Sequence, residues 1–212
     1  MNLVLLGAPG SGKGTQSKLI SKNFGIPHIS TGEIFRENIS QKTKLGILAE
    51  EYIINGQLVP DEITFEVIKK RLSQPDCKNG YILDGFPRTL EQGKLLKTFA
   101  KIDRVILLDI TLDELKRRIL GRRTCEDCGE IYNTSNYALD YCAKCNAKLI
   151  SRSDDTEQTI NKRVSVYEQQ TKPLIDFYNE ENLLLVVDCN NSPEEIFKII
   201  ESKLKIEGRF EI

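Results

Sequence analysis

A short glycine-rich segment near the start of the chain contains a single lysine and has the spacing of a phosphate cradle. The segment reads Gly7-Ala8-Pro9-Gly10-Ser11-Gly12-Lys13-Gly14-Thr15. It follows an apolar run and opens a helical pattern, which is the context that the GxxxxGK motif of a P-loop requires. Glycines let backbone N–H groups turn toward phosphate oxygens, and the helix N-terminus and Lys13 add positive charge. The alternative interpretation is a glycine-rich turn with a solvated lysine.

The type of residue that follows Lys13 indicates which groups would bind a magnesium ion. Gly14 stands where many P-loop proteins place a Ser or Thr that binds magnesium, and Thr15 comes one position later. We therefore expect Mg²⁺ to be held by substrate phosphates, water and a nearby carboxylate. Asp84 is the candidate, because it ends an apolar run at the strand edge that faces a bound nucleotide. Its alternative role is that of a turn former in Asp84-Gly85.

Four cysteines form two close pairs with the spacing of a metal site. Cys125-x2-Cys128-x13-Cys142-x2-Cys145 matches a four-thiolate zinc site. Four protein ligands leave no open position, so we expect a structural Zn²⁺ that fixes a turn-rich segment with almost no apolar core. A labile disulfide pair and an iron–sulfur cluster are the alternatives. Cys77 and Cys189 stand alone and are interpreted as incidental thiols.

Four arginines bracket the cysteine segment and are suited to clamping a polyphosphate. Arg118 and Arg122 are four residues apart in a helical pattern, so we expect them to project together from one helix, away from the core. Arg152 and Arg163 flank the far side of the segment. The alternative is a solvated basic face.

The elements that must position these residues alternate between apolar runs and amphipathic patterns. The runs that we interpret as buried strands are Leu3–Leu6, Tyr81–Leu83, Arg104–Asp109 and Leu183–Asp188, with a further strand end at Ile29-Ser30. Helix starts are indicated by a capping box at Thr111-x-x-Glu114 and by Ser192-Pro193-Glu194-Glu195. This alternation predicts an α/β fold with a parallel sheet covered by helices. We also expect a kink at Pro173, which lies inside a long helical pattern.

Two stretches break the alternation and are interpreted as insertions. Residues 30–59 are helical in pattern without a strand signal, and residues 122–158 contain the paired cysteines and many turn formers.

Composition limits the class of protein. The 212 residues include 30 basic and 31 acidic side chains, for a formal charge of -1, so nothing indicates bulk attraction to nucleic acid or to an anionic membrane. No stretch approaches ~20 consecutive apolar residues, and we expect a cytoplasmic protein. The segment Ile206–Arg209 is similar to a protease recognition site and is given no weight.

Several motifs occur together and in order, and together they resemble one family. They are GAPGSGKGT, ISTGE with Arg36 downstream, GQLVPDE, LDGFPRT, GRR, and RSDD followed by NKR. This set is similar to the adenylate kinase family in its long form, from Met1 to about Ile200. The resemblance implies a P-loop, doubly wound core with a parallel five-stranded sheet, formed by residues 1–29, 60–121 and 159–212. It also implies an AMP-binding insertion at 30–59, a zinc-bearing lid at 122–158 and a monomer.

The resemblance implies reversible, magnesium-dependent transfer of a phosphoryl group from ATP to AMP, giving two ADP. The AMP-binding residues that it implies are Thr31, Arg36, Gln57, Leu58, Val59, Gly85, Phe86, Pro87, Arg88, Gln92, Arg152 and Arg163. The ATP-binding residues are Gly10, Ser11, Gly12, Lys13, Gly14, Thr15, Arg118, Arg122, Ile131, Tyr132 and Asn191. The catalytic residues are Lys13, Asp84, Arg88, Arg122, Arg152 and Arg163.

Some of these residues have structural alternatives. Thr31 could cap the following helix, Gln92 could complete a capping box with Thr89, and Arg36 and Arg88 could be surface arginines. Glu33 stands where the family usually has Asp, which keeps the charge, and His28 is interpreted as structural. The spacer between the two cysteine pairs is shorter than in the zinc-bearing members of the family, so the resemblance does not give the geometry of the lid tip.

Rival functions remain at this point. Another nucleoside monophosphate kinase would act on UMP or CMP, against which the long lid and the Thr31/Gln92 pair argue. GTP as the donor is harder to exclude. A zinc-ribbon switch that binds nucleic acid is disfavoured by the charge of -1 and by the lack of basic residues interleaved with Tyr132, Tyr137 and Tyr141.

Overall fold

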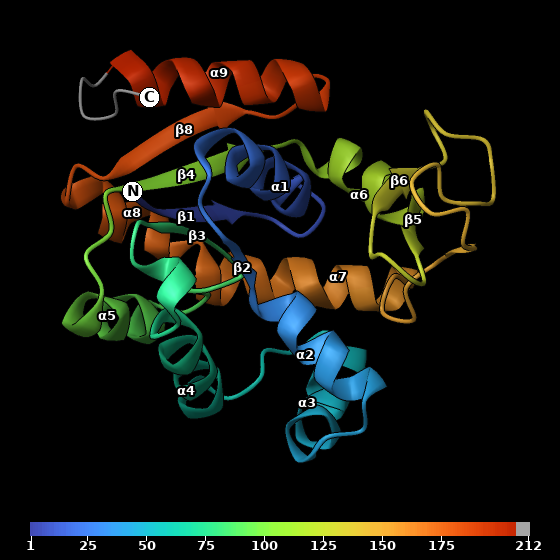
Figure 1. The fold of residues 1–212 in the computed structure, drawn as a ribbon, viewed down its shortest axis with the longest axis horizontal. Coiled ribbons are helices and arrows are strands. Elements are labelled where there is room, and N and C mark those ends of the chain that lie inside the picture. The colour runs from blue at the N-terminus through green and yellow to red at the C-terminus, as the bar shows by residue number, and fades with distance from the viewer. Residues whose placement is uncertain (207–212) are drawn as a thin grey trace.

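A five-stranded parallel sheet forms the centre of the protein (Figure 1). This computed structural model describes residues 1–206. The segment Ile206–Arg209, which is similar to a protease recognition site, therefore lies outside the described residues except for Ile206. The strand order is β2-β3-β1-β4-β8. The strands are β1 (Asn2–Gly7), β2 (His28–Ser30), β3 (Tyr81–Asp84), β4 (Arg104–Asp109) and β8 (Leu184–Asp188). The predicted strands are therefore confirmed to within a residue or two at each end.

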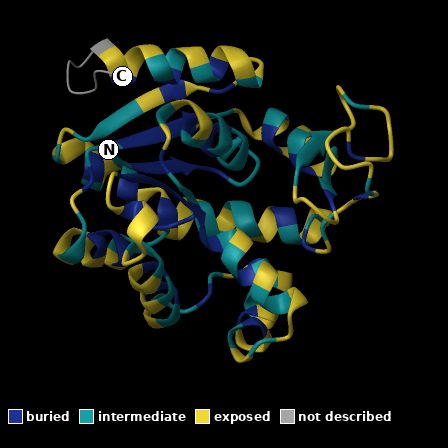
Figure 2. Ribbon diagram, in the orientation of Figure 1, coloured by how far each residue is buried: buried dark blue, intermediate teal, exposed yellow. Residues whose placement is uncertain are grey.

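Helices cover both faces of this sheet because side chains alternate along the buried strands. Leu3 and Leu5 of β1 pack against one helical layer, whereas Val4 and Leu6 pack against the other. The first layer contains α1 (Lys13–Phe24) and α9 (Pro193–Ile206). The second contains α4 (Asp61–Leu72), the short 3₁₀ turn Pro75–Cys77, α5 (Leu90–Phe99) and α8 (Pro173–Glu180). Figure 2 shows the buried residues concentrated on the sheet and on the inner helix faces, as expected for a doubly wound α/β fold.

The two stretches that break the alternation project from one end of the core. The first forms α2 (Thr31–Ser40) and α3 (Lys44–Ile54), which have a small apolar cluster of their own around Phe35 and Ala49. The second forms an antiparallel sheet of β5 (Arg122–Cys125), β6 (Ile131–Asn133) and β7 (Leu149–Ile150). This sheet lies at the right of Figure 1, and α2 and α3 lie at the bottom.

One of the two predicted capping boxes forms and the other does not. At the start of α9, Ser192 Oγ lies 2.7 Å from Glu195 Oε2, and the backbone N–H of Ser192 donates to the same carboxylate at 3.1 Å. At the start of α6 (Leu112–Leu120), the side chain of Thr111 makes no capping hydrogen bond, so that prediction is wrong. Glu114 instead accepts from Arg117 and Arg118 at 2.7 Å, because charge-assisted bonds outcompete a backbone N–H.

Arg118 and Arg122 do not share a helix, contrary to expectation. Helix α6 ends at Leu120, and Arg122 opens β5. The hairpin explains this, because Gly121 O accepts from Thr134 N at 2.8 Å and Arg122 pairs with Asn133 across the strands. A Cβ on Gly121 would lie 2.5 Å from the Asn133 side chain, so the tight turn into the hairpin suits glycine.

A π turn interrupts the long helical pattern just ahead of Pro173, the residue at which a kink was predicted. Helix α7 (Glu157–Val166) continues into a π turn, η2 (Tyr167–Thr171), before α8 begins at Pro173. Lys172 N donates to Tyr167 O at 2.9 Å, which is the i→i+5 bond of a π turn. Within residues 1–206, every helix is too short or too polar to cross a membrane.

Candidate functional site

A cavity of about 780 Å³ opens at the carboxyl ends of the parallel strands. It lies among the P-loop, the α2–α3 insertion and the small antiparallel sheet, which is where a doubly wound fold binds ligands. The predicted site residues that line it are Gly10, Gly12, Lys13, Gly14, Thr15, Thr31, Arg36, Gln57, Leu58, Val59, Asp84, Gly85, Pro87, Arg88, Gln92, Arg118, Arg122, Ile131, Tyr132, Arg152, Arg163 and Asn191. Ser11 and Phe86 are instead buried behind this lining, and Phe86 is part of the main apolar core.

The P-loop wraps around the amino end of α1. Gly12 caps this helix with φ of 96°, and Gly10 has φ of 85°, a region that favours glycine. A Cβ on Gly10 would also lie 2.6 Å from the side chain of Ile119, so α6 packs directly on the loop. The Lys13 ammonium group donates to Gly7 O at 2.7 Å and to Ala8 O at 2.9 Å. Burial lowers the pKa of Lys13 to about 8, against the opposing influence of Asp84.

Asp84 supplies an ionised carboxylate to the floor of the cavity. Burial acts to raise the pKa of Asp84, but His28 and the charge of Lys13 outweigh it and hold the pKa below its usual value. His28 Nε2 lies 3.4 Å from Asp84 Oδ2. A Cβ on Gly14 would lie 3.7 Å from the same oxygen, so the carboxylate faces the P-loop. An ionised oxygen donor beside a phosphate cradle fits the ligand preference of Mg²⁺.

Arginines concentrate positive charge on the walls of the cavity. Burial lowers the pKa of Arg88 to about 10 and that of Arg152 to about 9, and neighbouring arginines act in the same direction. Burial also lowers the pKa of Arg36. Such a cluster carries an electrostatic cost that a bound polyanion would relieve.

Two acidic residues that sequence reasoning left without a role organise part of this cluster. Asp155 forms a two-point ion pair with Arg122, whose Nε lies 2.7 Å from Asp155 Oδ2. Arg163 contacts both Asp154 and Asp155. Both carboxylates are almost fully buried, and both belong to the RSDD motif. The motif places them next to Arg152 in the sequence, which was the one available signal.

The α2 side of the cavity resolves the alternative roles of Thr31 and Gln92. Ser30, not Thr31, caps α2 by accepting from Glu33 N, and Thr31 Oγ1 donates to Gly85 O at 2.8 Å. Gln92 forms half of the predicted capping box, because its backbone N–H donates to Thr89 Oγ1 at 3.1 Å. Its side chain does not return to Thr89.

On the opposite side of the cavity, hydrogen bonds connect α6 and α1 to the segment that follows β8. Arg118 Nη2 donates to Cys189 O at 2.6 Å, which links α6 to the end of β8. Gln16, which the sequence did not single out, donates from Nε2 to Pro193 O at 2.9 Å. This bond fixes the loop that contains Asn191 against α1.

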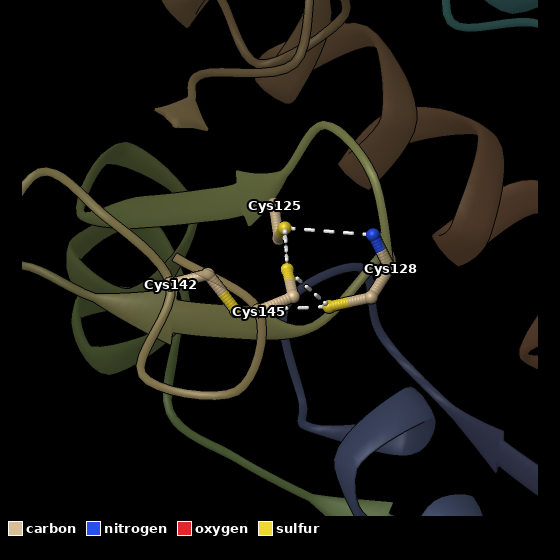
Figure 3. Close-up of side chains that lie close together, drawn as sticks. All are labelled: Cys125, Cys128, Cys142 and Cys145. Carbon is tan, nitrogen blue, oxygen red and sulfur yellow. Dashed lines mark hydrogen bonds between the residues drawn. The ribbon is translucent and has the colours of Figure 1, made fainter. Parts of the chain in front are cut away.

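The four predicted cysteine ligands meet at one point of the small sheet (Figure 3). Their sulfur atoms all lie within 4.8 Å of one another, and the closest pairs are 3.4 to 3.6 Å apart. A tetrahedral site with Zn–S bonds of ~2.3 Å has sulfurs roughly 3.8 Å apart, so the set needs little adjustment to hold zinc.

Hydrogen bonds favour the thiolate form of Cys142, one of the four cysteines. Tyr132 Oη lies 3.3 Å from Cys142 Sγ, and Lys144 N donates to the same sulfur at 3.4 Å. Desolvation acts to raise the pKa of Cys142, but these bonds lower it to about 6. The tyrosine therefore lines the cavity and also contacts the cluster.

The tip of the small sheet, which the sequence left open, is held by tyrosines. The rings of Tyr132 and Tyr137 lie 4.4 Å apart between centroids. Tyr137 Oη donates to Tyr141 O at 2.9 Å, which closes the shortened spacer onto itself.

Comparison with known proteins gives a consistent family. The model of the adenylate kinase family matches residues 5–183. An adenylate kinase of Clostridium tetani is 47% identical over 212 residues, which covers 96% of this chain and 98% of the relative. One of Clostridium perfringens is 50% identical over 208 residues, covering 94% and 96%, and one of Finegoldia magna is 47% identical over 213 residues, covering 97% and 99%. The chain therefore belongs to the adenylate kinase family.

Proposed function

We propose that the protein catalyses reversible, magnesium-dependent transfer of a phosphoryl group from ATP to AMP, giving two ADP. The observation that carries the proposal is one cavity with a P-loop on one side and a second set of arginines, Arg36 and Arg88, on the other. The arrangement suits two phosphate-bearing ligands that meet end to end.

The ATP side consists of the P-loop and arginines around the small sheet. Residues Gly10–Thr15 surround the phosphates, although Ser11 is buried and its contribution is to the shape of the loop. Lys13 supplies a mobile charge, and Arg122 and Arg152 close over the phosphates. Arg118, Ile131, Tyr132 and Asn191 lie about the adenine.

The AMP side consists of α2, the end of β3 and the start of α5. Arg36, Arg88 and Arg163 hold the AMP phosphate, with Arg152 shared between the two nucleotides. Thr31 and Gln92 face the adenine. Gln57–Val59 and Gly85–Pro87 shape the adenine pocket. Phe86 contributes from the apolar core, since its side chain is fully buried there.

The chemistry requires placement and charge compensation. An AMP phosphate oxygen is already anionic, so it attacks the γ-phosphorus in line without a general base. Lys13, Arg88, Arg122, Arg152 and Arg163 balance the charge that spreads over the equatorial oxygens. Mg²⁺, when bound, neutralises and orients the phosphates, and Asp84 would hold it through its carboxylate or through water.

Exclusion of water explains the two insertions. Residues 122–158 act as a lid and residues 30–59 as the AMP-binding insertion, on a core of residues 1–29, 60–121 and 159–212. Water left in the closed site would accept the phosphoryl group and waste ATP. Because Arg122 and Arg152 belong to the lid, closure delivers charge and removes water in one movement.

The cysteine cluster has a structural part in this proposal. Zn²⁺ held by Cys125, Cys128, Cys142 and Cys145 would fix the lid and leave no open position for substrate. We also propose that the protein is a monomer, which the family resemblance implies, and that it is cytoplasmic, which rests on its short apolar runs.

A panel of acceptors tests the proposal. Purified enzyme is supplied with Mg²⁺, with ATP or GTP as donor and AMP, UMP, CMP or GMP as acceptor, and diphosphate formation is followed by a coupled assay. We expect AMP with ATP to give the highest kcat/KM. A strong preference for UMP over AMP would contradict the assignment, and a preference for GTP would correct the donor.

A further inference from the structure

Asp61, in the GQLVPDE motif, bridges two helices behind the cavity. It is the first residue of α4, and both of its carboxylate oxygens are used at the start of α5. Thr89 Oγ1 donates to Asp61 Oδ2 at 2.8 Å, and Gln92 Nε2 donates to Asp61 Oδ1 at 2.7 Å. An ionised carboxylate only accepts hydrogen bonds, so its partner at Gln92 must be the amide nitrogen.

The other end of the Gln92 amide is fixed as well. Its Oε1 accepts from the backbone N–H of Arg88 at 2.7 Å, and the side chain is almost fully buried. A flipped amide would place Oε1 against the Asp61 carboxylate and the NH₂ group against the Arg88 N–H. Both hydrogen bonds would be lost, which is costly for buried groups. Asp61 and Arg88 therefore select a single orientation.

The amide keeps one donor and one acceptor position for a ligand. A primary amide has two N–H groups and two lone pairs, and one of each is used internally. Gln92 lines the cavity together with Thr31, Gln57 and Val59. Adenine offers an acceptor at N1 and a donor at N6, which complement a fixed amide. A 6-oxopurine such as hypoxanthine offers the reverse, a donor at N1 and an acceptor at O6.

We propose that Asp61 is a specificity-determining positioning residue, which locks the Gln92 amide in the orientation that binds adenine monophosphate and rejects 6-oxopurine monophosphates. The inference rests on the proposed function, because it takes the α2 side of the cavity as the acceptor site. Asp61 acts through Gln92 and does not contact the substrate.

A simpler role for Asp61 is that of an acidic residue in the first turn of a helix. Such residues stabilise the helix N-terminus through its dipole. Glu62 occupies the same first turn, is exposed, and could serve that purpose equally. Glu62 therefore provides a matched control, since neutralising it removes a first-turn charge without touching Gln92.

The test compares Asp61→Asn with Glu62→Gln. An asparagine amide can accept from Gln92 or donate to it, so both orientations of Gln92 become available. The enzyme is assayed with ATP and either AMP or IMP. We expect Asp61→Asn to lower the AMP-to-IMP ratio of kcat/KM by about tenfold or more, mainly through KM for the acceptor, with KM for ATP within about twofold. Glu62→Gln should keep the wild-type ratio.

Further variants separate specificity from folding. Asp61→Glu keeps a carboxylate that accepts both bonds and should restore most of the ratio. Melting curves monitor the fold, and Asp61→Ser, which a helix N-terminus tolerates, replaces Asp61→Asn if the latter does not fold. An unchanged ratio in a folded Asp61 variant, or a wild type that does not distinguish AMP from IMP, overturns the inference. Failure of the wild type to use AMP at all would overturn the proposed function itself.

Discussion

Lys13 shows how a single buried charge limits the conditions in which the site can work. Its ammonium group lies on two carbonyls of the P-loop, and burial lowers its pKa to about 8. The side chain attracts phosphate only when it is protonated, which requires a pH below this pKa. Bound phosphates supply negative charge and must raise the pKa again.

We therefore expect kcat/KM for ATP to fall as the pH rises through about 8, since this parameter reports the free enzyme. Above that pH the decrease should approach about tenfold per pH unit. The value of kcat/KM for AMP at saturating ATP is the internal control, because it reports the ATP-bound enzyme, in which the phosphates keep Lys13 and Arg152 protonated, and it should stay level as the pH rises through about 8. A level profile for ATP up to pH 10 would contradict this role of Lys13.

At the residue scale, most of the site residues that the sequence predicted do line the cavity, but the partners that orient them were not predicted. The types and spacing of Lys13 and Arg88 are enough to indicate phosphate chemistry. Which carboxylate meets which arginine depends on contacts between distant segments, so the ion pair of Arg122 with Asp155 was not foreseen. The same holds for Asp61 and Gln92, which are 31 residues apart.

At the scale of elements, one side chain of the proposed lid contacts both the cavity and the cysteine cluster. Tyr132 lies on β6, lines the cavity, and places its hydroxyl 3.3 Å from Cys142 Sγ. The same hydroxyl accepts from Ala143 N at 3.1 Å. Hydrogen bonds of this kind orient metal ligands and strengthen their binding.

Tyr132→Phe should therefore release zinc faster from the intact enzyme, by about tenfold or more. Release is measured with a colorimetric zinc indicator in the presence of excess chelator. Tyr137→Phe is the matched control, because it removes a hydroxyl from the same ring pair while its bond goes to the Tyr141 carbonyl. Equal release rates in wild type and Tyr132→Phe would show that the contact does not support the metal.

The bounds of helices and strands were predicted well wherever the local hydrophobic pattern of the sequence determines them. The buried parallel strands are continuous apolar runs, which explains why their bounds were nearly right. The extension of α6 to Arg122 was wrong because pairing with β6 captures the backbone after Gly121. The Thr111 capping box was wrong because two arginines compete for Glu114.

At the scale of the whole molecule, the proposed lid has an apolar cluster that is separate from the main core. Its apolar cluster consists of Cys125, Cys142 and Leu149 with a few partly buried neighbours, and two of the three buried residues are proposed zinc ligands. Such a small cluster cannot hold a sheet by itself. The metal is thus expected to supply much of the stability of the lid.

Removal of zinc by a chelator should lower the melting temperature or produce an additional transition at lower temperature. Differential scanning calorimetry distinguishes the two results, since the sheet core melts as a separate cooperative unit in the second case. Addition of zinc after removal of the chelator should restore the original melting curve. A curve that the chelator leaves unchanged would argue against a structural metal.

The sequence also predicted the doubly wound core, but not the way in which it brings the site together. Alternating strands and helices indicate a parallel sheet without specifying the order β2-β3-β1-β4-β8. That order depends on how the helical connections cross over the faces of the sheet. It is what places the ends of β1, β2 and β3 around one cavity.

The π turn between α7 and α8 bears on how the gene can change in length. It allows Arg163 to line the cavity, Thr171 to donate to Arg88 O at 2.8 Å, and Leu174 to enter the main core. Deletion of one codon within Tyr167–Thr171 would restore a regular helix and rotate one of these faces against the other by about 100°. Ala138 and Leu139, which are exposed in the spacer between Cys128 and Cys142, bear no such constraint. Insertions and deletions should therefore accumulate at these two positions and be eliminated from the π turn.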